Sequence, residues 1–300
     1  FEYYSGIHRD REKLLIEFHA AIKNMFSNIN FNTDKLSLEN DKSILLSATL
    51  FGDITSKIDS NSDKKDEVTY LDVPNKASID HSISREKVSL PDDSEHYTAF
   101  VTLKTFASIL RNSELVANLK LKKDSLDDLF TYWDDVFLFL LAMVKADVKK
   151  LTEDNLTTEQ EQELTRFFTL MLTFVYSYVI VEKSSSPKMK TLFEEYFESN
   201  NTAHRTLAIL CYIDIDIRKA IEVTKKSLTF FNNKGFYLQA IYIFYLHKYL
   251  ENGRFNKSKE QANTIKSILA EISFTLSGQG KKAKSQIVSQ ALIKLEEVKK

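Results

Sequence analysis

The sequence predicts an all-α fold in which antiparallel helical hairpins stack as an α-solenoid, interrupted by a long polar insert. Two observations lead to this fold class. The 300 residues include only 6 glycines and 3 prolines, whereas average usage would give roughly 21 and 15. Because the tight turns of many-stranded sheets need these residues, a β-sandwich or barrel is not expected. Apolar residues also recur at steps of three and four along most of the chain, which is the period of an amphipathic helix.

Residues 1–54 are expected to form N-terminal helices. The first covers residues 9–29, where Leu15, Phe18 and Ile22 recur on one face, and a short second helix is expected at residues 43–54. Residues 55–98 differ in composition, because they hold a polar run and two of the three prolines. A loop of this length is unusual inside a compact domain. We therefore expect a flexible polar insert at residues 55–98.

From residue 99 to residue 300 the sequence predicts a helical-repeat-like domain. Asp124 and Ser125 are expected to cap a helix that runs to about residue 148. The next helix is expected from Thr157 to about residue 182, and it contains the apolar run 167–181. This run is shorter than the ~20 residues that cross a bilayer, so we expect a core helix and no membrane span. Residues 184–187 break this helix, and a short helix follows at 188–198.

Two helical hairpins are expected within residues 201–273. The first pairs residues 203–213 with 217–231, and the second pairs residues 236–250 with 255–273. Gly253 is expected in the turn of the second hairpin. A final helix is expected at residues 282–298, and because its outer face is basic and polar, we expect it to cap the stack.

Small and large residues in these hairpins follow a recognisable spacing. Small side chains are expected where two helices cross closely, large apolar ones between the crossings, and a glycine in the turn. The residues that follow this spacing are Leu207, Ala208, Ala220, Ser227, Leu228, Tyr242, Tyr245, Tyr249, Gly253, Phe255 and Ser258. This spacing resembles that of tetratricopeptide repeats. The second unit departs from the family pattern, because Leu246 and Ile265 stand where the family usually has Gly or Ala.

The resemblance implies a concave groove that binds a peptide segment or a neighbouring subunit. Its lining would consist of Arg205, Ile209, Tyr212, Ile243, His247 and Leu250. Arg205 and His247 would hold a polar or acidic group of the partner, and Tyr212, Ile243 and Leu250 would supply apolar contact. The alternative is that these residues only pack against the final helix. If the groove exists, charge reversal at Arg205 should weaken partner capture without lowering the melting temperature.

Charge is balanced overall but divided along the chain. The net charge is −1, which does not indicate a globally basic nucleic-acid binder. Residues 124–163 hold eleven acids against three bases, and residues 187–300 hold nineteen bases against eleven acids. Such regions either orient a charged partner or are two solvated faces.

Residues that carry chemistry do not form a known catalytic or metal-binding pattern. The single cysteine, Cys211, rules out an intrachain disulfide, and none of the six histidines has another histidine three or four positions away. His204 and Cys211 could share a helical face, but a core thiol is the favoured interpretation. Asp127 and Asp128 are adjacent on a helix and point ~100° apart, so they cannot act together on one atom. We expect no catalytic residue, no cofactor and no metal.

The expected function is that of a non-enzymatic interaction scaffold or subunit of a multiprotein complex, with a protein partner bound on a helical groove. A cytoplasmic or nuclear location is expected, because one lone cysteine fits a reducing compartment. Two alternatives stay open. One is a nucleic-acid-associated helical protein that uses the basic C-terminal region, and the other is an enzyme built on a helical bundle.

Overall fold

The structure is a computed structural model that describes residues 11–31, 95–113, 116–155, 157–255, 259–277 and 293. Over these residues the regular elements are all helical, which confirms the all-α prediction. They are α2 (Arg11–Asn28), α5 (Glu95–Asn112), α6 (Leu119–Asn155), α7 (Thr158–Ser184), η2 (Pro187–Met189), α8 (Lys190–Glu194), α9 (Thr202–Ile215), α10 (Ile217–Ser227), α11 (Gly235–Phe255) and α12 (Lys259–Ser277). The helix expected at 43–54 and the insert up to residue 94 lie outside the described residues, as does the helix expected at 282–298 apart from residue 293.

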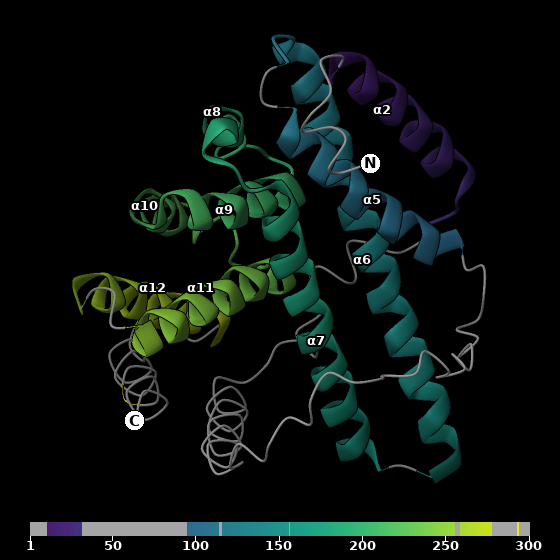
Figure 1. Cartoon of the computed structure of the whole chain (residues 1–300). Coiled ribbons are helices and arrows are strands. Elements are labelled where there is room, and N and C mark those ends of the chain that lie inside the picture. The colour runs from purple at the N-terminus through teal and green to yellow at the C-terminus, as the bar shows by residue number, and fades with distance from the viewer. Residues whose placement is uncertain are drawn as a thin grey trace, which may run out of the picture.

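Helix α7 joins two groups of helices. On one side of it lie α5 and α6, with α2 packed on both, and on the other side the α9–α10 and α11–α12 hairpins project away (Figure 1). The α7 helix contacts α5, α6, α9 and α11. The lower ends of α6 and α7 extend past the other labelled helices (Figure 1). Among the described helices, the N-terminal half of α7 therefore has fewer neighbours than its C-terminal half.

A cluster of buried aromatic side chains holds the two groups together. Trp133 of α6 donates a hydrogen bond from Nε1 to the carbonyl oxygen of Tyr176 on α7 at 3.1 Å. The Tyr176 ring makes edge contacts with Phe137 of α6 at 5.2 Å and with Phe236 of α11 at 5.4 Å. Each fully buried aromatic ring of this kind contributes roughly 1.5–3 kcal/mol through burial alone. The cluster therefore fixes α11, and with it the second hairpin, against the α6–α7 pair.

The two C-terminal hairpins stack with equivalent helices in contact. The α9 helix contacts α11, and α10 contacts α12. Between the hairpins, the hydroxyl groups of Thr224 on α10 and Tyr245 on α11 lie 3.0 Å apart and share a hydrogen bond. Ala208 and Ala220, two of the small residues singled out in the sequence, are fully buried. Small side chains at these positions let α9 and α10 approach closely.

Several predicted helix ends are confirmed. Thr157 caps α7 through a capping box, in which its hydroxyl accepts from the backbone N–H of Gln160 and the Gln160 side chain accepts from the backbone N–H of Thr157. The α7 helix ends at Ser184, and Pro187 opens the short η2 helix that follows. Asn201 and Asp216 cap α9 and α10 with their side chains. These ends follow from local side-chain hydrogen bonds, which is why the sequence indicates them.

Several predicted boundaries are wrong. The α10 helix ends at Ser227 and not at residue 231, and α12 begins at Lys259 and not at residue 255. Asp124 does not cap α6, because the helix begins at Leu119, where the Asn118 side chain accepts from the Leu121 backbone N–H at 3.0 Å. The α5 helix begins at Glu95, so the last four residues of the expected insert are helical. Gly253 lies inside α11 and not in a turn. A glycine costs a helix only about 1 kcal/mol relative to alanine, so α11 continues through it.

Candidate interaction surface

Most of the residues predicted to line a groove are buried. Arg205, Ile209 and Tyr212 on α9 lie inside the molecule, as does Ile243 on α11. The α9 helix is buried almost from end to end, because it is enclosed by α6, α7, α8, α10 and α11. Of the predicted set, His247 and Leu250 on α11 are partly exposed. The described surface therefore does not present these six residues together to a partner.

Arg205 makes contacts within the chain. It is 7% exposed, and its Nε donates to the Ser199 carbonyl oxygen at 2.9 Å. Its guanidinium carbon lies 3.9 Å from the centre of the Phe230 ring. Burial lowers the pKa of Arg205, and the charge of Glu198 opposes this shift. These contacts tie α9 both to the loop before it and to the turn after α10.

Tyr212 is likewise held inside the chain. Its hydroxyl donates to Oε1 of Glu194 on α8. Burial raises the pKa of Tyr212, and the hydrogen bond to Glu194 adds to the shift. The Phe197 ring packs edge-on against the Tyr212 ring with centres 5.0 Å apart. Tyr212 thus fastens α8 and the turn that follows it onto α9.

The exposed part of α7 carries the most conspicuous surface feature. Five large apolar side chains lie on consecutive turns of this helix and are between 38% and 50% exposed: Phe167, Phe168, Met171, Phe174 and Tyr178. We call these five residues the α7 face. Four of them follow steps of four, three and four, which places them in one stripe along the helix. The opposite side of α7 is buried and includes the small polar residues Thr169, Thr173 and Ser177.

The α7 face is ordered by contacts between its own rings. The Phe174 and Tyr178 rings stack with centres 5.4 Å apart, and the Phe167 and Phe168 rings meet edge to face at 5.6 Å. His247 of α11 packs edge-on against Tyr178 at 5.5 Å and against Phe174 at 6.4 Å. The one predicted histidine of the groove therefore borders the α7 face at its C-terminal end.

Charged residues lie at both ends of the α7 face. Glu163 is exposed one turn before Phe167, and Glu161 is partly exposed beside it. Glu182 lies one turn after Tyr178, where Lys183 Nζ is 3.5 Å from its carboxylate and Arg111 Nη1 donates to its backbone carbonyl oxygen at 2.8 Å. Cations therefore accompany Glu182. Arg166 lies between Glu163 and Phe167 and offsets one of the two acidic charges there, so the N-terminal end of the face is the more acidic one by a single charge.

A polar contact between α6 and α9 has the outline of a catalytic triad, and the sequence did not predict it. Asp127 Oδ1 lies 3.5 Å from His204 Nδ1, and His204 Nε2 lies 3.0 Å from Thr131 Oγ1. However, the Thr131 hydroxyl also lies 2.9 Å from the Asp127 carbonyl oxygen. The backbone carbonyl therefore competes with the imidazole for the single hydroxyl proton, which a nucleophile would have to give to the imidazole. Burial lowers the pKa of His204, and Asp127 opposes this shift.

Asp128, next to Asp127 on α6, makes a comparable contact with a histidine on α2. Asp128 Oδ2 lies 2.6 Å from His19 Nε2 on α2 and 3.3 Å from Lys23 Nζ. Asp127 and Asp128 thus reach α9 and α2 respectively, as expected for adjacent residues on a helix. These pairs join α6 to helices on either side of it.

The described residues offer little else that could carry chemistry. Cys211 is fully buried, and burial raises the pKa of its thiol, which disfavours the nucleophilic thiolate. Among the residues that the structure describes, no group of three or more His, Cys, Asp or Glu side chains is placed to hold a metal ion.

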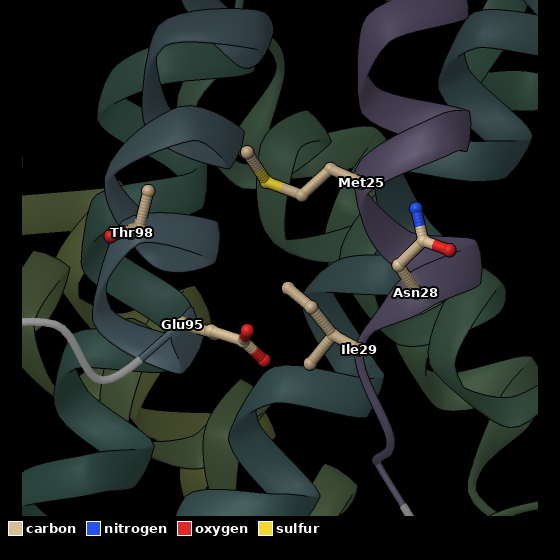
Figure 2. Close-up of a pocket in the computed structure, with 5 residues that line it drawn as sticks. All are labelled: Met25, Asn28, Ile29, Glu95 and Thr98. Carbon is tan, nitrogen blue, oxygen red and sulfur yellow. The ribbon is translucent and has the colours of Figure 1, made fainter.

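A cavity of about 370 Å³ lies between the end of α2 and the start of α5. Met25 and Asn28 of α2, Ile29 directly after it, and Glu95 and Thr98 of α5 line it (Figure 2). The only charged group in this lining is the Glu95 carboxylate. Residues 32–94, which connect these two helices in the chain, lie outside the described residues. The lining by itself does not define a ligand.

Within the described part of the chain, one helical segment is long and apolar enough to cross a membrane, by length and composition. It is Gln160–Ser184, with a mean hydropathy of 1.6 over its most apolar window, of which 39% is buried. A core helix of a water-soluble protein passes the same test, so this finding is weak evidence for a membrane span.

Comparisons with known proteins yield no relative from which a function could be carried over. No family model, no curated protein and no solved structure matches the chain.

Proposed function

We propose that this chain is a non-enzymatic interaction subunit that binds a protein partner on the α7 face. The observation that carries the proposal is the set of five large apolar side chains exposed on one helix. Aromatic side chains have areas of 150–250 Å² each, so the exposed fractions amount to roughly 400 Å² of apolar surface. Apolar patches of about 300–600 Å² are the largest on typical monomers and are often functional.

The arrangement of the hairpins supports a scaffold of the tetratricopeptide-like kind. Equivalent helices of the two hairpins contact each other, as they do in stacked helical repeats. In this proposal the partner binds beside the stack, on α7, with His247 at the border between the two surfaces. The partner resides in the cytoplasm or nucleus, where the single buried cysteine stays reduced.

Removal of the apolar surface tests the proposal. In a variant with Phe167→Gln and Met171→Gln, two side chains that are about half exposed lose their apolar character with little loss of core packing. We expect the full-length variant to melt within a few degrees of the wild-type chain and to lose specific partners in affinity purification with mass spectrometry.

Two exposed apolar residues elsewhere provide a matched control. Tyr97 on α5 and Leu119 at the start of α6 are 61% and 67% exposed. A variant with Tyr97→Gln and Leu119→Gln removes comparable apolar surface away from the α7 face, and we expect it to retain the partners. If both double variants capture the same proteins as the wild-type chain, the α7 face is not the binding surface.

A further inference from the structure

The backbone of α7 restricts what kind of segment can cover the α7 face. Inside a helix every backbone N–H and C=O group is already hydrogen-bonded, so the face offers no backbone partner to an extended peptide. An extended segment pressed onto it would bury unsatisfied backbone groups at a cost of about 1–3 kcal/mol each. A helix satisfies its own backbone groups. The occupant favoured by this surface is therefore a helix.

The dimensions of the stripe fit one helix. Phe167, Met171, Phe174 and Tyr178 follow the alternating steps of three and four that form the seam between two packed helices. At 1.5 Å per residue this stripe is about 16 Å long, which corresponds to three helical turns. With one more turn to reach Glu163, a partner helix of about four turns covers the whole surface.

Charge favours a partner protein over a second copy of this chain. An antiparallel second copy centred on the stripe would bring Glu163 of one copy to Glu182 of the other, because both glutamates lie one turn beyond the apolar residues. Lys183 offsets only part of this repulsion, since it is already paired with the neighbouring Glu182. A parallel second copy would place equal charges side by side. A basic segment meets neither obstacle.

The direction of the partner helix follows from the same charges. The acidic end of the face, with Glu161 and Glu163, is at the N-terminal end of α7. Lysine and arginine are most favourable in the last turn of a helix, where they also compensate the helix dipole. An antiparallel partner brings that last turn to Glu161 and Glu163, and its dipole then runs opposite to that of α7.

We infer that the occupant of the α7 face is a single amphipathic helix of a partner protein, packed antiparallel to α7, with basic residues in its C-terminal turn beside Glu161 and Glu163. This inference rests on the proposed function, and it specifies the class of partner. The partner helix carries apolar residues at steps of four, three and four.

Synthetic helical peptides of about 18 residues test the inference on the full chain. All three peptides carry leucines at steps of four, three and four. The first peptide has two lysines in its last turn, the second has two glutamates in its last turn, and the third has two lysines in its first turn. We expect fluorescence anisotropy at low salt to show binding of the first peptide about tenfold tighter than the second. The preference should shrink as salt screens the charges.

A charge-swap variant provides the sharpest control. With Glu161→Lys and Glu163→Lys the chain should prefer the glutamate peptide, while its melting temperature stays close to that of the wild-type chain because both side chains lie at the surface. Equal binding of all peptides, or a preference for the peptide with lysines in its first turn, would overturn the inferred partner.

The other occupants give different results. A dimer that forms with rising concentration and is lost in the variant with Phe167→Gln and Met171→Gln would identify a second copy as the occupant and overturn the inference. Face-dependent binding to phosphatidylcholine–phosphatidylserine vesicles without peptide binding would identify a lipid surface and overturn it too. If peptide binding ignores charge but partner capture still needs the α7 face, the inference fails and the proposed function stands. If neither peptide binding nor partner capture depends on the α7 face, both the inference and the proposed function fail.

Discussion

Arg205 shows most directly how burial changes an expectation drawn from the sequence. As a groove residue it would tolerate substitution without loss of stability. In the structure its side chain is enclosed, with Nε 2.9 Å from the Ser199 carbonyl oxygen and its guanidinium over the Phe230 ring. We therefore expect Arg205→Met to lower the melting temperature, although methionine fills much of the same space.

The size of this effect follows from the individual contacts. Loss of the Nε hydrogen bond leaves a carbonyl oxygen without its donor, at a cost of about 1–3 kcal/mol. Loss of the cation–π contact costs about 0.5–2 kcal/mol. The ion pair with Glu198 adds almost nothing, because its atoms are 3.9 Å apart and the glutamate side chain is 89% exposed. A total of about 2–4 kcal/mol corresponds to a decrease of about 5–10 °C.

Thermal unfolding followed by circular dichroism at 222 nm measures this decrease, and urea denaturation gives the corresponding free energy. Arg218→Met is the matched control, because Arg218 lies at the surface and pairs at 3.4 Å with Glu260, which is also exposed. We expect the control to change the unfolding free energy by less than about 0.5 kcal/mol. An Arg205→Met protein that melts within 1 °C of the control would refute the structural role assigned to Arg205.

Three further predictions concern buried groups elsewhere. Burial lowers the pKa of His204 below its usual value of about 6.5, so the unfolded chain binds the proton more readily than the folded chain. The unfolding free energy should therefore fall as the pH drops below about 6.5. His204→Gln should reduce this loss, measured by urea denaturation at pH 7.5 and at pH 5. Cys211 is fully buried, so a maleimide should label it slowly in the native chain and much faster in urea, and fast native labelling would contradict its burial. Tyr237 donates to both oxygens of the buried Asp134 carboxylate at 3.0 and 3.2 Å, so Tyr237→Phe should cost about 1.5–3 kcal/mol in unfolding free energy, and an unchanged value would contradict this contact.

Local signals in the sequence predict the long helices well. The start of α7 at Thr157 and its end before Pro187 depend on residues within a few positions of each boundary. The start of α6 was misplaced because Asn118 and Asp124 are both suitable capping residues. In the structure the Asn118 side chain also donates to Oε1 of Glu12 on α2 at 3.1 Å, a contact that is not local in sequence.

The exposure of individual residues could not be predicted in the same way. Arg205 is a charged residue on a helix, and such residues are rarely buried unless they are paired. Its partners, Ser199 and Phe230, come from a loop and from the turn after the next helix. His204 similarly meets Asp127 and Thr131 across a long stretch of chain. Contacts of this kind arise from tertiary packing, which the helical period of one segment does not reveal.

The buried side of α7 combines large apolar side chains, such as Tyr176 and Ile180, with small polar ones. The hydroxyl groups of Thr173 and Ser177 donate to the carbonyl oxygens one turn earlier, at 2.6 and 2.5 Å, so these residues are buried with their donors satisfied. Their small size lets neighbouring helices approach. Phe167 and Met171 lie on the other side of the helix and are about half exposed, so the described packing of α7 depends little on them. Large apolar groups at the surface, which water solvates poorly, are therefore the basis of the proposed binding surface.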